Sequence, residues 1–182
     1  MLHLDLGLGS APPPAFLPAL NQPKFMSQRQ TWICDSCGKT IEYAEDGWVE
    51  WLVRQEGERY VGHGLHLVHQ HPAPGLPDCR YQMEVFRHEA FVIHDVDLLE
   101  CVGADGLVEL LSMIAGEVVP TSELVEMIQR LHVPGYEYAR SYFEAAIEAG
   151  VIEPSNRAGF FLTKDINAVN AWRVQQPGQE GG

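Results

Sequence analysis

Basic side chains and cysteines are both scarce in this chain of 182 residues. Lys and Arg together number 12 against 25 Asp and Glu, which gives a formal net charge of -13 at pH 7. Because phosphate contacts need clustered Lys and Arg, this balance argues against a broad nucleic-acid-binding surface. The chain holds 4 cysteines, too few for a disulfide scaffold. They fit a metal site in a reducing compartment better.

Long apolar runs and familiar catalytic motifs are missing as well. No stretch approaches the roughly 18 apolar residues that cross a bilayer, so we expect no membrane association. Residues 1–20 lack a basic n-region and a small-residue cleavage site, which favours a cytoplasmic protein. The chain has no Gly-rich phosphate loop, no nucleophile elbow and no credible triad, so we expect a non-enzymatic protein.

Composition and periodicity divide the chain into four segments. Residues 1–28 are rich in Pro, Leu and Ala without periodicity, as is typical of a disordered tail. Two interpretations of the residues before Met26 stay open: an ordinary flexible tail, or an overextension upstream of a start at Met26. Residues 29–102 predict a β-rich module that carries the metal residues. Residues 103–166 predict a helical module, and residues 167–182 a flexible C-terminal tail. The predicted fold class is therefore α+β.

Strands in the first module are predicted from runs of β-branched and aromatic residues. Two short ones flank a pair of cysteines, and a longer one follows an Asp46-Gly47 turn. The predicted strands cover residues 31–33, 40–42, 48–54, 60–61, 65–69 and 91–94.

The pair Cys34 and Cys37, followed by Gly38, predicts a metal site. Two thiolates three positions apart can point both sulfurs at one tetrahedral ion, and the glycine leaves room for the tight turn. A closed site needs two further ligands. We expect Cys79 as the third ligand and His69 as the fourth. His71 stays open as the alternative, but Pro72 ends the strand at His71, which favours His69. The remaining candidates, Cys101 and the histidines His63, His66, His88 and His94, are expected to be core or surface residues.

Three cysteines and one histidine would leave no coordination position for water. That geometry is typical of structural zinc, whose binding free energy of roughly 10–16 kcal/mol becomes folding free energy. The expected cofactor is therefore structural zinc.

Apolar residues recur at helical spacing in the second module. The pattern predicts three helices, the third over residues 136–149, followed by a β-hairpin over residues 151–163. Three helices and a hairpin are the element order of a winged helix. The apolar positions are Leu107, Leu110, Leu111 and Ile114 in the first helix, Leu124, Met127, Ile128 and Leu131 in the second, and Ala139, Tyr142, Phe143, Ala146 and Ile147 in the third.

Two resemblances rest on these residues. Residues 34–39, Cys-Asp-Ser-Cys-Gly-Lys, resemble one knuckle of a zinc ribbon, although a ribbon closes with a second Cys-x-x-Cys that this chain lacks. Residues 105–163 resemble a winged-helix domain. The arrangement as a whole is similar to that of uncharacterised bacterial proteins with an N-terminal zinc knuckle, a resemblance that implies no function.

A hydrolase is one alternative. The run His69-Gln70-His71-Pro72 resembles the His-x-His-Pro core of JAMM-type metalloproteases, a resemblance that would make Glu50 the general base. The serine and aspartate that follow in that family fall here on Arg80 and Met83, so the motif is incomplete.

The other choice is between nucleic acid and protein as partner. On the predicted third helix, Glu137, Glu144 and Glu148 outnumber Arg140, and the predicted wing offers only Arg157. Side chains that read bases or touch phosphates are nearly missing, which disfavours a DNA-binding regulator of winged-helix type. We expect an adaptor or regulator that acts through protein contacts. No sequence pattern indicates its oligomeric state. Aromatic anchors for such a contact are Tyr136, Tyr138 and Tyr142.

Overall fold

The computed structural model describes residues 30–72, 78–82, 90–155, 157 and 159–175. Within these ranges the chain forms two small antiparallel sheets together with helices, which confirms the α+β class. The predicted tail over residues 1–28 lies outside the described part. In that part, no helix combines the length and the apolar character needed to cross a membrane.

The first sheet is a two-stranded ribbon. Strand β1, Trp32–Ile33, pairs antiparallel with β2, Thr40–Ile41, in the register Trp32 to Ile41 and Ile33 to Thr40. Both strands were predicted from their β-branched and aromatic residues. The turn that joins them carries Cys34 and Cys37, so the ribbon is the element that presents the cysteine pair.

The second sheet has three antiparallel strands in the order β4-β3-β5. Its strands are β3, Gly47–Glu56, β4, Arg59–His69, and β5, Val92–Asp97. The two strands predicted over residues 60–61 and 65–69 are one strand, because a bulge at Gly64 lets β4 continue past Trp51 without breaking the ladder. Gly64 has φ +72°, a backbone conformation that favours glycine.

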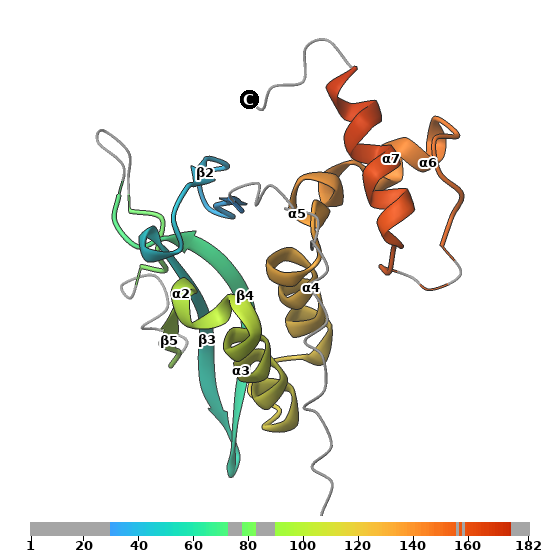
Figure 1. Ribbon diagram of the computed structural model, residues 1–182. Helices are drawn as coiled ribbons and strands as arrows, with labels where there is room; N and C mark the ends of the chain where they lie inside the picture. Colours follow the sequence, from blue (N-terminus) through green and yellow to red (C-terminus); the bar gives the residue numbers. More distant parts are fainter. Residues whose placement is uncertain (1–29, 73–77, 83–89, 156, 158, 176–182) are drawn as a thin grey trace, which may run out of the picture.

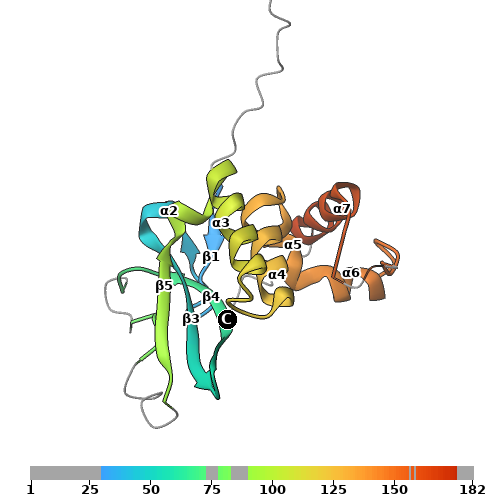
Figure 2. The same ribbon diagram turned by 90° about the horizontal axis from the view of Figure 1, so that it is seen from below.

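Helices cover one face of this sheet (Figure 2). They are α2, Leu98–Cys101, α3, Gly103–Ala115, and α4, Thr121–His132, and a short 3-10 turn, η1, spans Ala44–Asp46. One apolar core joins Val49 and Leu67 of the strands to Leu110 and Leu124 of the helices. The sheet and the first two predicted helices therefore form one packing unit, which extends well past the predicted module boundary at residue 102.

In the C-terminal part, the helices and strands differ from the predicted ones. The single helix predicted over residues 136–149 is divided into α5, Tyr136–Ala139, the 3-10 turn η3, Arg140–Tyr142, and α6, Phe143–Glu148. The described residues between 151 and 162 contain no strand, so the predicted hairpin is not formed there. Residues 167–174, predicted to be a flexible tail, belong to helix α7, Thr163–Val174.

A second apolar core explains this difference. Ile166 and Val169 of α7 are fully buried against Phe143 of α6, and Phe161 stacks on Phe143 with ring centroids 3.7 Å apart. Phe161, which lies in the predicted hairpin, therefore packs against a helix instead. Figure 1 shows α6 and α7 beyond α5, on the side of the molecule away from the second sheet.

Candidate metal centre

The turn between β1 and β2 positions two of the four predicted ligands. The amide of Cys34 donates to the carbonyl of Lys39 at 2.9 Å, and the amide of Gly38 donates to the carbonyl of Cys34 at 2.9 Å. Gly38 has φ +70°, a left-handed backbone conformation that favours glycine. Local hydrogen bonding therefore places both cysteines on the same side of the turn.

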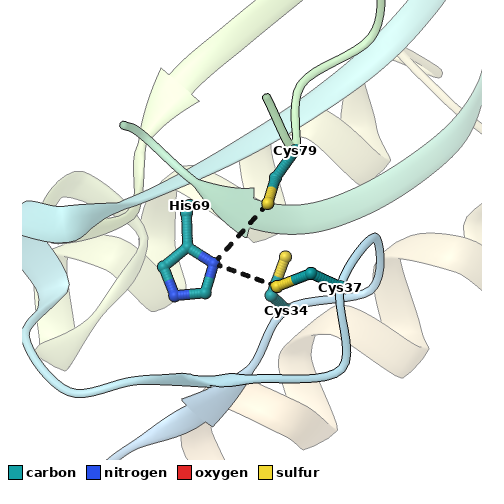
Figure 3. Close-up of side chains that lie close together, drawn as sticks. All are labelled: Cys34, Cys37, His69 and Cys79. Atoms are coloured by element: carbon teal, nitrogen blue, oxygen red, sulfur yellow. Dashed lines mark hydrogen bonds between the residues drawn. The ribbon is translucent and has the colours of Figure 1, made fainter. Parts of the chain in front are cut away.

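The other two predicted ligands come from the end of β4 and the segment beyond it. His69 is the last residue of β4, and Cys79 is 3% exposed on the segment that follows. One ligand atom from each of Cys34, Cys37, His69 and Cys79 lies within 4.8 Å of the others. Figure 3 shows the four side chains converging.

The predicted alternatives lie elsewhere. His71 is exposed and does not belong to this cluster, and Cys101 is 0% exposed in the apolar core, as expected. His66 contacts Glu50, His63 packs edge-on to Phe91, and the ring of His94 lies 5.8 Å from that of Trp51. The prediction for His88 lies outside the described residues.

Two distances within the cluster are close to those of a tetrahedral metal site. Nδ1 of His69 lies 3.5 Å from Sγ of Cys37 and 3.9 Å from Sγ of Cys79 (Figure 3). For a metal–sulfur distance of about 2.3 Å, tetrahedral geometry sets neighbouring ligand atoms roughly 3.5–3.8 Å apart. The four side chains therefore lie close enough together that they could hold one ion.

The second ring nitrogen of His69 also suits a metal ligand. Its Nε2 lies 3.3 Å from the carbonyl oxygen of Thr40 in β2. With the proton on Nε2 donated to that carbonyl, Nδ1 keeps its lone pair facing the sulfurs. A backbone carbonyl in this position sets the tautomer and the ring orientation of a metal-binding histidine.

The thiols of the cluster differ in acidity. Burial, together with hydrogen bonding to Cys37, raises the pKa of Cys79 to about 12. Burial also acts to raise the pKa of Cys37, but hydrogen bonds from the Lys39 backbone amide and from Cys34 outweigh it and lower that pKa. A bound cation favours the thiolate form of every cysteine that coordinates it.

Asp35, between the two knuckle cysteines, attaches the turn to β4. Its amide donates to the carbonyl of Leu67 at 2.8 Å, and its Oδ2 accepts from the amide of Leu67 at 2.8 Å. Leu67 is two residues before His69, so this pair of hydrogen bonds sets the distance between the cysteine turn and the histidine.

A buried ion network, the Arg130 network, extends from Asp35 into the helices. We use this name for Asp35, Arg130, Glu137 and Arg140. The guanidinium of Arg130 donates to Oδ2 of Asp35 at 2.6 Å, to the carbonyl of Ile33 at 3.0 Å, and to both carboxylate oxygens of Glu137 at 2.8 and 2.9 Å. The side chains of Arg130 and Glu137 are each 4% exposed.

Arg140 completes this network from the partly exposed side. It donates to Oδ1 of Asp35 at 2.9 Å and pairs with Glu137 at 3.2 Å. Burial acts to raise the pKa of Asp35, yet the charge of Arg130 outweighs it and lowers that pKa. The turn that carries Cys34 and Cys37 is thereby joined to α4 and α5 through charged hydrogen bonds.

The Arg130 network was not predicted, although the sequence holds one signal for it. Arg130 follows the buried Met127 by three residues, so helical periodicity places it on the buried face of α4. Glu137 and Arg140 were predicted on an exposed recognition helix. The structure corrects that assignment for Glu137, which is 5% exposed and bonded to Arg130.

Glu50 holds the segment that carries Cys79 against the sheet. Its side chain is 0% exposed, and Oε1 lies 2.8 Å from Nε2 of His66 and accepts from the amide of Tyr81 at 2.7 Å. The ring of Tyr81 stacks on His66, and the guanidinium of Arg80 lies 3.8 Å from the ring centre of Trp48. The carboxylate that would act as a base in the hydrolase hypothesis therefore has structural partners.

Comparison with known proteins does not extend this picture: no family model, no curated protein and no solved structure matches the chain.

Proposed function

We propose that this protein is a non-enzymatic adaptor or regulator that acts through protein contacts and uses a structural zinc ion to hold its N-terminal part together. The observation that carries the proposal is the convergence of Cys34, Cys37, His69 and Cys79 within 4.8 Å. Three soft thiolates and one imidazole are a donor set that favours zinc over hard cations such as Mg²⁺.

The ligand number supports a structural role for the ion. Four protein donors fill a tetrahedral site, whereas a catalytic zinc keeps a position for water. Cys34 and Cys79 are 1% and 3% exposed, whereas Cys37 and His69 are partly buried, so two of the four donors are closed to solvent. A hydrolase of the His-x-His-Pro type would use His71, which is exposed and apart from the cluster.

The charge distribution supports a protein partner over DNA. Arg140, the one basic residue of the predicted recognition helix, is engaged with Asp35 and Glu137. Glu144 and Glu148 are exposed on α6 and would repel phosphates. The predicted aromatic anchors are also used internally: Tyr136 is 3% exposed and donates to Glu126, while Tyr138 contacts Thr31. We therefore propose a partner surface elsewhere on the molecule.

The proposal is tested by isolating the tagged chain from its native cells before and after nuclease treatment. We expect a stoichiometric protein partner that withstands the nuclease and is lost in the Cys37→Ser variant, which has one ligand fewer. The control is Cys101→Ser, which alters a thiol outside the cluster and should keep the metal. An association that nuclease abolishes would favour the DNA-binding regulator, and metal-dependent hydrolysis by the purified chain would favour the enzyme.

A further inference from the structure

We infer that the outer face of helix α3 is a docking surface for a basic amphipathic helix of a partner protein. This inference rests on the proposed adaptor function and names the class of partner. The surface, called here the α3 stripe, consists of Ala104, Val108, Leu111 and Ala115. All four residues are exposed, with Val108 at 64% and Leu111 at 50%.

The spacing of the α3 stripe matches that of a helix–helix seam. Its members follow one another at intervals of four, three and four residues, so they lie in one line along an α-helix. The line covers about 16 Å, or roughly three helical turns. The opposite side of α3, formed by Gly106, Leu110 and Met113, packs into the core.

Helix α3 carries more apolar residues than it buries in the core. Leu107 and Ile114 lie between the buried side and the stripe and are half-buried. The apolar arc therefore continues from the core around to the exposed Val108 and Leu111. A surface helix normally presents polar residues on that side, and a helix that is apolar over most of its circumference is normally covered by a partner.

Charge around the stripe indicates which kind of helix would cover it. Residues 98–117, which include α2 and α3, contain four carboxylates and no Lys, Arg or His. Their positions are Glu100, Asp105, Glu109 and Glu117. An amphipathic helix with an apolar seam flanked by Lys or Arg would bury the stripe and pair with these acids. A second copy of this chain would bring two acidic segments together, and the net charge of -13 opposes that contact.

A labelled synthetic peptide tests the inference on the full zinc-loaded chain. The probe is an amphipathic helix about three heptads long with Leu along its seam and Lys beside the seam. The matched control peptide has Glu in place of Lys. Fluorescence anisotropy should show micromolar binding of the Lys peptide that weakens with salt, and no binding of the Glu peptide. Equal binding of the two peptides, or none of either, would overturn the inference.

Variants locate the contact. The double variant Val108→Gln with Leu111→Gln should weaken binding by about tenfold or more. The matched control is Leu162→Gln with Val174→Gln, which changes two apolar residues of similar exposure far from α3 and should leave binding unchanged. If both double variants bind alike, the α3 stripe is not the docking site.

A photo-crosslinking residue at position 111 identifies the occupant. Crosslinks to the Lys peptide support the inference. Crosslinks to residues 1–28 of the same chain, or to a second copy, would show that the stripe is an internal or a self-association surface and overturn it. Zinc content is measured on the same samples. If the chain contains zinc but does not bind the peptide, the docking surface is refuted and the proposed function is not. If the purified chain contains no zinc, the proposed function is refuted.

Discussion

Replacing Arg130 with methionine should destabilise the protein strongly, because it leaves a buried carboxylate without its main partner. Arg130 makes hydrogen bonds to Asp35, Ile33 and Glu137, and the side chain of Glu137 is 4% exposed. Removing one partner of such a buried pair costs about 3–5 kcal/mol. Arg140 remains 3.2 Å from Glu137, so we expect the lower end, about 3 kcal/mol.

Urea unfolding followed by circular dichroism, with zinc in excess at pH 7, measures this change. In thermal unfolding of a chain of this length, a loss of about 3 kcal/mol in the free energy of unfolding corresponds to a drop in Tm of roughly 6–12 °C. Arg54→Met is the matched control, because Arg54 pairs with Glu56 at the surface, where both side chains are nearly half exposed. Solvent screening leaves that pair with a contribution of less than about 1 kcal/mol.

The double variant Arg130→Met with Glu137→Gln separates charge from packing. Removing the buried negative charge should recover part of the lost stability, because a neutral amide carries a smaller desolvation penalty. An Arg130→Met variant within about 1 kcal/mol of the parent would refute the reasoning, since it would mean that the network contributes no more than a surface pair.

Three further outcomes are expected from the same structure. His69→Ala should lower metal affinity by about tenfold or more in a chelator competition, whereas His71→Ala should leave it unchanged; the reverse would make His71 the ligand. Alkylation followed by mass spectrometry should label Cys37 once the metal is removed. Cys101 should remain unlabelled until the chain unfolds, because burial raises its pKa to about 12, and equal labelling of both thiols in the folded protein would contradict this. Gel-shift titration should find no duplex DNA binding tighter than about 10⁻⁵ M at physiological salt, and nanomolar, salt-sensitive binding to a defined site would contradict it.

The N-terminal strands and the convergence of Cys34, Cys37, His69 and Cys79 were predictable where local chemistry decides the structure. The Cys-x-x-Cys-Gly turn sets its own hydrogen bonds, and β-branched residues mark the strands on both sides of it. The choice of His69 over His71 followed from Pro72, which cannot continue β4. In each case, residues close in sequence determine the outcome.

The C-terminal part could not be predicted because long-range packing decides it. Phe161 is an aromatic residue of the kind that favours strands, but its ring stacks on that of Phe143. This contact depends on how α7 packs against α6. The Arg130 network has the same origin. Asp35 and Arg130 are 95 residues apart, and neither position alone indicates the other.

X-ray absorption at the zinc edge of the purified full-length chain tests the central claim most directly. The account predicts about one zinc per chain, with three sulfur neighbours near 2.3 Å and one nitrogen near 2.0–2.1 Å. The Cys37→Ser variant should lose most of the metal under the same conditions. A spectrum dominated by oxygen and nitrogen neighbours, or full zinc occupancy in Cys37→Ser, would contradict the Cys34, Cys37, His69 and Cys79 site.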